Sequence, residues 1–450
     1  MRYRYRTDEE LKDSGVEWIG KIPKDYKLEP LKKYFMFEKG RNAGIYTAEY
    51  VGKNEGEYPV YSGQTENEGI MGLIDSYEYD LRQCLFTTTV GAKVMTVLYL
   101  TGKFTLSQNC LIMINNMNNV CTKYAYYYLQ ELFRYEKSLI PLYMQPSLRI
   151  EDLKRYKILI QNLREQEKIA NFLDKKTSQF DSIISKKEKL IEKLEEAKKS
   201  IISEVVTGKV KVVKNDDGYE LVKRKSDEMK DSGVEWLGDI PKDWAVKKFK
   251  YIFSLNKGLS ITKVDLKEEG IPCVNYGEIH SRYRFELKPS IHKLKYVDEL
   301  YLKYNTTSLL SYGDFIFCDT SEDIDGCGNF TCLNENSSIF AGYHTIIAKA
   351  LKQINFRYMS YSFDSNSWRM QIRTRVSGVK VFSITQTILK ETNIIMPYLL
   401  EQENIVKYLD VKCNEINSSI CKIKLQIEKL KEAKQSLISE VVTGKIEILD

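Results

Sequence analysis

The spacing of apolar residues predicts two long helices. From about residue 165 to 207, apolar side chains recur in steps of three and four, which is typical of a coiled-coil seam. The predicted seam of the first helix consists of Phe180, Ile183, Leu190, Leu194, Ala197, Ile201 and Val205. The predicted seam of the second helix includes Ile416, Ile423, Leu430, Leu437 and Val441. Gly208 and Gly444 follow these seams, where C-cap glycines are expected.

An apolar stripe this narrow needs a partner along its whole length. About 43 residues at 1.5 Å each make a helix of roughly 65 Å. Charged residues fill most other positions, so those faces are expected to meet water. The natural partner is the second helix, and because a globular segment separates the two in sequence, we expect them to run antiparallel. The alternative, a surface helix packed on its own domain, fits the length and the period less well.

Both helices belong to an internal repeat. The motif KDSGVEWIGKIPKDY at 12–26 recurs as KDSGVEWLGDIPKDW at 230–244, an offset of 218 residues. IEKLEEAKKSIISEVVTGK at 191–209 recurs as IEKLKEAKQSLISEVVTGK at 427–445, an offset of 236. The second copy is therefore 236 − 218 = 18 residues longer between its motifs. Free drift after a duplication would not preserve the ends alone, so we infer a shared support for two different globular parts.

The segments near 30–155 and 250–390 look unrelated and predict mixed domains of roughly 150 residues each. Expected strands lie at 58–61, 81–89, 93–100, 110–114, 270–275, 313–318 and 338–348, with a helix at 123–133. The expected class is α+β, with two globular α/β domains in pseudo-twofold repeat separated by two long antiparallel coiled-coil helices. The expected boundaries are 1–160 and 230–396 for the domains, 161–210 and 397–450 for the helices, and 211–229 for a linker.

Composition narrows the classes of function. The 450 residues carry 68 Lys and Arg against 62 Asp and Glu, a net charge of +6, which permits a nucleic-acid partner without requiring one. No apolar run approaches the roughly 20 residues that cross a bilayer, and the charged N-terminus MRYRYRTDEE does not fit a signal peptide. We therefore expect a cytoplasmic protein. Nine cysteines without a CxxC pair indicate free thiols rather than disulfides or a zinc site.

Motifs of the common enzyme classes are missing from the sequence. The nine prolines include no Pro-Pro pair, so the NPPY/F tetrad of methyltransferases is absent. The sequence also lacks the GxxxxGK[ST] phosphate loop and a PD…(D/E)xK nuclease motif. The acidic residues at 314–325 do not follow calcium-loop spacing and are interpreted as a solvated loop. We therefore expect the chain to be no enzyme, and we expect no metal site.

Polar and aromatic residues of the predicted loops are candidates for contacting DNA. Asn, Gln, Arg, Ser and Thr can hydrogen-bond to base edges or to phosphates. In the first variable segment the candidates are Tyr61, Ser62, Gln64, Thr88, Lys93, Gln108 and Asn109. In the second they are Asn275, Tyr276, Glu278, Thr320, Ser321, Tyr343, His344, Arg373 and Arg375. All of these residue types also serve structural roles.

These doubled motifs make the chain similar to the specificity subunit of a type I restriction-modification system. The resemblance covers nearly the whole chain. It rests on the doubled SGVEWxGxIPKD(Y/W) motif, on the EQE at 165–167 and 401–403, and on the doubled IEKLxEAKxSxISEVVTGK. GIPCVNYGEI at 270–279 resembles an early strand of that family's recognition domains, and YPVYSG at 58–63 resembles another form of it.

The resemblance implies a non-catalytic reader of a bipartite, asymmetric DNA target. Each recognition domain would read one half-site, with an unread gap set by the helices. The implied partners are double-stranded DNA, two methyltransferase subunits and motor-nuclease subunits, with no membrane. No cofactor is expected on this chain: the methyltransferase partner would carry S-adenosylmethionine, and the motor-nuclease partner ATP and Mg. The alternatives are a coiled-coil scaffold that never touches DNA and a self-sufficient enzyme with an unrecognised site.

Overall fold

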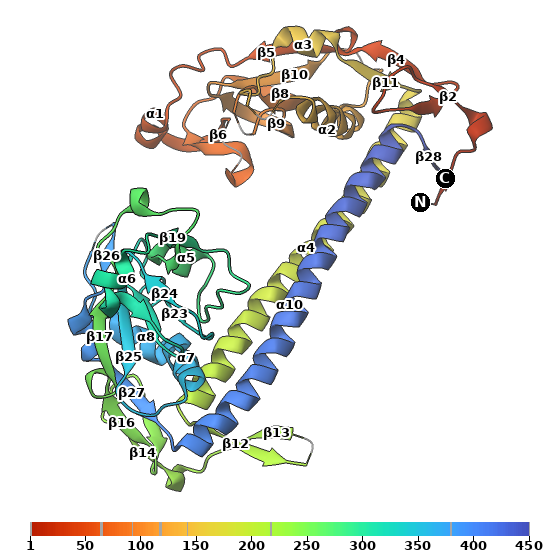
Figure 1. Cartoon of the computed structure of the whole chain (residues 1–450). Helices are drawn as coiled ribbons and strands as arrows, with labels where there is room; N and C mark the ends of the chain where they lie inside the picture. Colours follow the sequence, from red (N-terminus) through yellow and green to blue (C-terminus); the bar gives the residue numbers. More distant parts are fainter. Residues whose placement is uncertain are drawn as a thin grey trace. The chain divides into compact units, whose positions relative to one another are not determined.

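A computed structural model describes residues 2–63, 66–91, 93–116, 119–141, 143–216, 218–378 and 380–449. The chain divides into two compact units. The first unit is Met1–Glu188 with Lys424–Asp450, and the second is Lys189–Ile423. Each unit therefore contains one globular domain and a part of both long helices (Figure 1).

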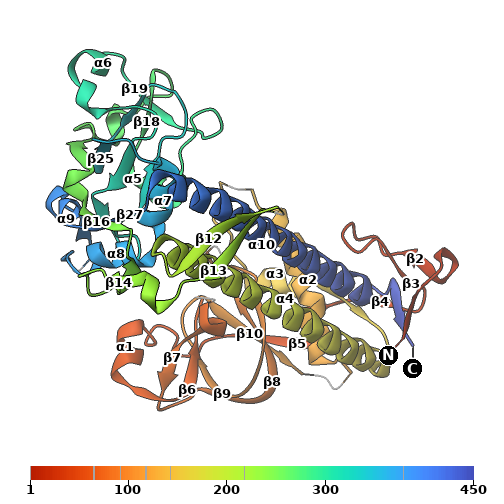
Figure 2. The same ribbon diagram turned by 90° about the horizontal axis from the view of Figure 1, so that it is seen from below.

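The two long helices are α4, Leu163–Val206, and α10, Leu399–Val442, with 44 residues each. In the first unit, Lys434 Nζ donates to Asp181 Oδ1 at 2.6 Å, and Lys187 Nζ donates to Gln426 Oε1 at 2.7 Å. In the second unit, Lys198 pairs in the same way with an asparagine of α10. Residue numbers rise along α4 as they fall along α10, so the helices lie side by side and antiparallel within each unit (Figures 1 and 2). The predicted fold class is confirmed.

The seam differs from the predicted one at three positions of α4, Ile183, Leu190 and Ala197, all of which are exposed. Ile183 and Leu190 are 44% and 45% exposed, and the adjacent Ile184 and Ile191 turn inward instead. The apolar stripe offers two neighbouring residues at these turns, and the sequence alone does not decide between a step of three and a step of four. The other predicted seam residues are buried or half-buried, namely Phe180, Leu194, Ile201, Val205, Ile416, Ile423, Leu430, Leu437 and Val441.

Both helices end as predicted, in a glycine with a left-handed backbone. Gly208 and Gly444 have φ of +73° and +75°. The amide of the following lysine donates to the carbonyl five residues back, at 3.0 Å for Lys209 and 2.9 Å for Lys445. This is the Schellman arrangement, in which a residue without a Cβ avoids the steric penalty of positive φ.

The first globular domain contains a six-stranded sheet in the order β5-β10-β8-β9-β6-β7. The strands are β5 Phe35–Lys39, β6 Glu55–Tyr61, β7 Ile70–Ile74, β8 Tyr79–Thr88, β9 Val97–Leu106 and β10 Cys110–Asn115. The helices are α1 Ala48–Lys53, α2 Thr122–Ser138 and α3 Ile150–Arg155. Residues 93–96, expected within a strand, precede β9 in a turn where Met95 has φ +62°.

The second globular domain has two four-stranded sheets, in the orders β17-β25-β21-β23 and β19-β18-β24-β20. Its elements are β17 Phe253–Lys257, β18 Ile271–Val274, α5 Tyr276–Ser281, β19 Lys295–Val297, α6 Tyr301–Tyr304, β20 Leu309–Leu310, β21 Phe315–Cys318, β23 Phe330–Cys332, β24 Ile339–Ala341, β25 Thr345–Ala350, α7 Phe356–Asp364, α8 Asn366–Arg373 and α9 Gln386–Lys390. A short pair, β22 Thr320–Ser321 with β26 Phe382–Ser383, lies beside them. The strand expected at 338–348 is broken at His344, which has φ +56°.

Small strand pairs repeat at equivalent places in both units. The repeated motif at 12–26 and 230–244, which we call the leading motif, contributes to a strand pair in each unit. The pairs are β2 Leu11–Asp13 with β3 Lys21–Pro23, and β14 Met229–Asp231 with β15 Asp239–Pro241. Further pairs are β4 Lys27–Pro30 with β11 Lys157–Ile160, and β16 Ala245–Lys248 with β27 Asn393–Met396. The two units are therefore built alike around their different sheets.

The stretch 211–229, expected as a linker, contains a hairpin. Its strands are β12 Val210–Asn215 and β13 Gly218–Lys223. In the first unit the equivalent pair joins the two ends of the chain, because β28 Ile446–Ile448 pairs with β1 Tyr3–Tyr5 (Figure 1). The C-terminal residues thus complete the first unit.

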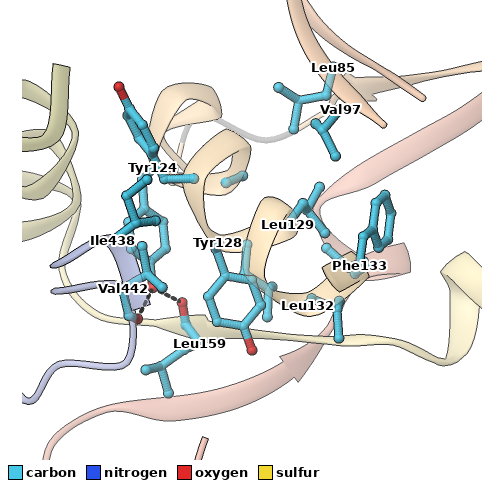
Figure 3. Packing of buried hydrophobic residues seen from close by; sticks show 14 of the residues in the cluster. Leu85, Val97, Tyr124, Tyr128, Leu129, Leu132, Phe133, Leu159, Ile438 and Val442 are labelled. Carbon is cyan, nitrogen blue, oxygen red and sulfur yellow. Dashed lines mark hydrogen bonds between the residues drawn. The ribbon is translucent and has the colours of Figure 1, made fainter. Parts of the chain in front are cut away.

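Each unit has its own apolar core, in which the globular domain meets the helices. In the first unit, Tyr124, Tyr128 and Phe133 of α2 pack against residues that include Ile438 and Val442 of α10 (Figure 3). The second core is rich in aromatic rings, among them Phe249, Phe253, Phe315, Phe317, Phe363 and Trp368. Among the described residues, no helix is long and apolar enough to cross a membrane.

We predict that Gly208→Ala destabilises the second unit by about 2–5 kcal/mol. A Cβ at this position would lie 2.4 Å from Pro241 Cδ and 2.9 Å from Trp244 Cζ3. The substitution therefore adds overpacking, about 1–3 kcal/mol, to the left-handed backbone penalty of about 1–2 kcal/mol. Urea unfolding of the full chain measures the loss.

The matched control for this substitution is Gly233→Ala. Gly233 has φ +69° and no heavy atom within 4 Å of the added Cβ. It should lose only the backbone part, about 1–2 kcal/mol. Equal losses in both variants would contradict the close packing of Gly208 on the leading motif.

Candidate DNA interface and its support

The first globular domain is tied to α4 by a cluster of three residues, Arg6, Tyr26 and Glu165, which we name the first seat. The Tyr26 hydroxyl donates to Glu165 Oε1 at 2.8 Å, and Arg6 Nη2 lies 3.3 Å from the same oxygen. Burial, reinforced by the Glu165 carboxylate, raises the pKa of the Tyr26 hydroxyl. The hydroxyl therefore stays protonated and remains a donor to the carboxylate.

The second unit repeats this cluster with Arg224, Trp244 and Glu401, the second seat. The indole Nε1 of Trp244 donates to Glu401 Oε2 at 2.7 Å, and Arg224 Nη2 donates to Oε1 at 2.6 Å. In both seats the guanidinium carbon lies 5.5 Å from the centroid of the aromatic ring. A carboxylate at the start of each long helix thus accepts from the leading motif, although the aromatic donor differs.

The glutamine of each EQE motif forms a second set of hydrogen bonds, here called a tie, between a long helix and its globular domain. Gln166 Oε1 accepts from the amide of Cys121 at 2.9 Å, and its Nε2 donates to the Gln161 carbonyl at 2.9 Å. Gln402 Oε1 accepts from the amide of Asn355 at 3.2 Å, and its Nε2 donates to a main-chain carbonyl at 2.9 Å. Both side chains are buried. Each glutamine holds the start of a domain helix, α2 or α7, against its long helix.

Equivalent hydrogen bonds between a globular domain and the long helices, which together with the two seats we call the support, also occur in the segments that look unrelated in sequence. The Tyr124 hydroxyl donates to Leu159 O at 2.9 Å and to Val442 O at 3.4 Å (Figure 3). Its counterpart Tyr358 donates to Ile395 O at 3.1 Å and to the carbonyl of Val206, near the end of α4, at 3.5 Å.

A third offset, 358 − 124 = 234, relates these tyrosines, between the offsets of 218 and 236 of the flanking motifs. Tyr127 and Tyr361 share this offset, as do Lys123 and Arg357. They contact Asp174 and Asp410, which have the offset of 236 that the long helices share. Sequence comparison missed this repeat because only scattered positions match.

In the first domain, the candidate DNA contacts gather on connected loops. The amide of Ser107 donates to Tyr61 O at 2.8 Å, and the amide of Thr89 donates to Asn109 O at 2.9 Å. These bonds join the ends of β6, β8 and β9. The exposed candidates on the loops are Lys93, Gln108 and Asn109.

The other candidates of this domain are less accessible. Thr88 is buried, and its hydroxyl donates to the carbonyl of Lys93. Ser62 is buried, and the half-buried Tyr61 ring lies 5.7 Å from that of Phe86. Their assignment as DNA contacts stays a prediction. Gln64 lies outside the described residues.

In the second domain, four candidates line one cavity of about 620 Å³, a size that suits a ligand group. They are Tyr276, Thr320, Ser321 and His344. The cavity also has lining residues that sequence reasoning did not select, including His280, Arg284, Glu322 and Asn329. Parts of the chain almost 70 residues apart thus meet at one place.

The remaining candidates of the second domain have structural partners. Asn275 is buried and caps α5, where its amide donates to Glu278 Oε2 at 2.9 Å. Tyr343 packs beside a small apolar cluster. Arg373 Nη1 lies 3.3 Å from the carboxylate of Asp325. Arg375 lies 6.0 Å from the ring of Trp236. Their assignment as DNA contacts stays a prediction.

A chain of hydrogen bonds links the buried Arg369 to three lining residues, Asn329, His280 and Thr320, which we call the floor of the cavity. Arg369, 3% exposed, donates from Nη1 to Asn329 Oδ1 at 3.0 Å. Arginine can only donate, so the amide nitrogen of Asn329 faces His280 Nδ1, 2.8 Å away. His280 Nε2 then donates to the Thr320 carbonyl at 2.9 Å. Burial lowers the pKa of Arg369 to about 10. No sequence pattern marks these three residues as partners.

The sequence profile of the family described as "Type I restriction modification DNA specificity domain" matches residues 35–196 and 241–429. The two matched ranges make up more than half of the chain and contain both candidate DNA-contacting regions. The chain belongs to this family. Its role is therefore DNA recognition, and the alternative of a scaffold that never touches DNA is not supported.

Individual relatives agree with the family assignment. The type I restriction enzyme MjaVIII specificity subunit of Methanocaldococcus jannaschii is 22% identical over 435 residues, covering 95% of this chain and 94% of the relative. The type I restriction enzyme MpnII specificity subunit of Mycoplasma pneumoniae is 32% identical over 133 residues, 30% of this chain and 39% of the relative.

The fold is also similar to a solved structure from work on complex assembly and conformational transition of the type I R-M system. The TM-score is 0.67 and the identity 11%, covering 94% of this chain and 99% of the other. At this identity the likeness concerns the fold.

Cysteines and metal-binding groups add no further chemistry in the described part of the chain. The nine cysteines are free thiols, as predicted; seven are buried, Cys121 is half-buried and Cys421 is exposed. No group of three or more His, Cys, Asp or Glu suited to hold a metal ion occurs among the described residues.

We predict that Glu401→Ala destabilises the second unit by about 3 kcal/mol. The substitution leaves the side chain of Arg224, 6% exposed, and the indole N–H of Trp244 without their acceptor. Breaking a buried ion pair on one side costs about 3–5 kcal/mol, and Glu401 itself is only partly buried. Urea unfolding of the full chain measures the change.

The matched control is Glu403→Ala, two residues further along the same motif. Glu403 is exposed, so its removal should change the stability by less than about 0.5 kcal/mol. A loss of similar size in both variants would show that the second seat does not stabilise the unit.

Proposed function

We propose that this chain is the non-catalytic DNA-recognition subunit of a type I restriction-modification complex. It binds a bipartite, asymmetric duplex target, with one half-site for each globular domain. It directs partner subunits to methylate adenine or to cleave DNA. The observation that carries the proposal is the repeated support, with its two seats, beneath two unlike domains in a member of a DNA-specificity family.

The unlike domains are the reason to propose two different half-sites. One domain presents the loops around a six-stranded sheet, and the other presents a cavity beside two four-stranded sheets. Base readout depends on which side chains reach the base edges. Two surfaces of different construction therefore read different bases, and the whole target is asymmetric.

The chemical steps belong to partner subunits in this proposal. The missing methyltransferase and nuclease motifs support this division of labour. Two methyltransferase subunits carry S-adenosylmethionine, and motor-nuclease subunits carry ATP and Mg; this chain holds no cofactor. A net charge of only +6 also fits a complex in which the partners neutralise many of the DNA phosphates.

Exchange of one globular domain should change one half-site only. We expect a chain whose residues 254–354 are replaced by the equivalent segment of another family member to fold, because both seats and the Gln402 tie lie outside the exchanged part. Sequencing of methylated bases in cells with the complete complex should show one new half-site and one unchanged half-site.

Two controls distinguish recognition of the DNA sequence from catalysis of methylation or cleavage. Cells without this gene should lose the bipartite motif entirely, and the purified chain alone should neither methylate nor cut DNA. Robust methyl transfer by the isolated chain would contradict the non-catalytic assignment. A simultaneous change of both half-sites after the exchange would contradict independent reading.

Lengthening the helices should lengthen the unread gap. The seam from Phe180 to Val205 spans 26 residues, about 39 Å at 1.5 Å per residue. This length is close to one duplex turn of about 34–36 Å, so we expect half-site centres roughly one turn apart. Four added residues contribute about 6 Å, near two base pairs, and roughly preserve the apolar face.

The insertion should be made in both helices, because each unit holds a part of α4 and a part of α10. The expected methylated motif contains the same bases and a gap longer by about two base pairs. A matched control replaces four exposed helix residues without adding any, and should leave the gap unchanged. A folded, active insertion variant with the original gap would show that something other than these helices sets the spacing.

A further inference from the structure

The cavity of the second domain has an aromatic wall centred on Tyr276. The ring centroid of Tyr276 lies 5.1 Å from that of His344 and 6.1 Å from that of His280, both edge-on. Tyr276 comes from the start of α5, and His344 from the break between β24 and β25. Such a wall keeps water away from one side of the cavity and strengthens any hydrogen bond formed beside it.

The polar groups of the floor are already occupied. Both ring nitrogens of His280 are hydrogen-bonded, one to Asn329 and one to the Thr320 carbonyl. His280 therefore offers its ring surface and has no free nitrogen with which to read a ligand. The chain of hydrogen bonds behind it, anchored by the buried Arg369, keeps this surface in a fixed orientation.

The rim of the cavity carries one carboxylate without a partner. Asp323 Oδ1 accepts from the amide of Gly326, and Asp325 pairs with Arg373. Glu322 is exposed and has no hydrogen bond or ion pair within the described part of the chain. Glu322 is therefore free to accept hydrogen bonds from a ligand.

The charge of the rim selects the kind of DNA group that can enter. Arg284, the cation among the lining residues, is paired with Asp364 at 2.8 Å. The carboxylates of Glu322 and Asp323, which no cation pairs within the described residues, therefore repel phosphate. A free carboxylate needs a donor, and in the major groove the base edges offer only two, the N6 amino group of adenine and the N4 amino group of cytosine.

We propose that this cavity reads an adenine or a cytosine of the second half-site, with Glu322 accepting from the exocyclic amino group beside the wall formed by Tyr276 and His344. The inference rests on the proposed function and adds to it a named acceptor and a class of base. Glu322 is a specificity-determining residue: it decides which base is accepted and takes no part in methyl transfer.

The test compares methylated motifs in cells that carry the complete complex with the native chain, Glu322→Ala or Glu322→Gln. In Glu322→Ala, one base pair of the second half-site should become degenerate, with about tenfold more methylation at sites that differ there. Glu322→Gln keeps an acceptor oxygen and adds an N–H donor, so a preference for cytosine should weaken, whereas a preference for adenine should persist because glutamine can bond to both N6 and N7 of adenine. The first half-site and the gap should stay unchanged.

The matched control is Glu269→Ala, which removes an exposed carboxylate of the same unit that does not line the cavity. Its motif should equal the native one. The inference is overturned if both Glu322 variants keep the native base preference, or if methylation falls equally at all sites, as loss of a non-specific contact would cause. Absence of any motif that depends on the native chain would instead refute the proposed function.

Discussion

The partly buried carboxylate at the start of each long helix forms the interaction on which the rest of the structure depends. Glu165 and Glu401 accept hydrogen bonds from an aromatic donor and pair with an arginine of the preceding segment. A charge removed from water is tolerated only with such partners. The same aromatic side chains also lie against the glycine that ends the other helix, Gly444 beside Tyr26 and Gly208 beside Trp244. Each unit therefore requires the start of one helix and the end of the other.

This arrangement explains how one support carries two unlike domains. The seats, the buried glutamines and the tyrosines of α2 and α7 make equivalent hydrogen bonds in both units, although the sheets between them differ in strand order. Substitutions in the loops can then change which bases are read without disturbing the buried contacts that hold the domain. The strand pair formed by the two chain ends extends the same plan, because it reproduces the hairpin that follows α4.

The sequence predicts the parts of this account that depend on local pattern. The helices, their glycine caps and the mixed domains follow from periodicity and turn residues, and all agree with the structure. The seam register at Ile183 and Leu190 was wrong because adjacent residues are both apolar and only the partner helix decides between them. The tyrosine repeat at Tyr124 and Tyr358 could not be found, because shifting offsets hide it. For the candidate interface, the assignment of the loops to DNA contact stays a prediction. The sequence could not show that Thr88 is buried or that His280 and Glu322 share a cavity with His344, since those facts depend on long-range packing.

The central claim is that the support is the same in both units and that each globular domain recognises its own half-site independently. One chimera tests this claim most directly. Residues 254–354 are replaced by residues 36–120, so that both supports carry the first domain's sheet, and the methylated motif is determined in cells with the complete complex. The account predicts a folded chain that methylates a motif containing the first half-site twice. Retention of the native second half-site, or a motif with bases found in neither native half-site, would contradict it.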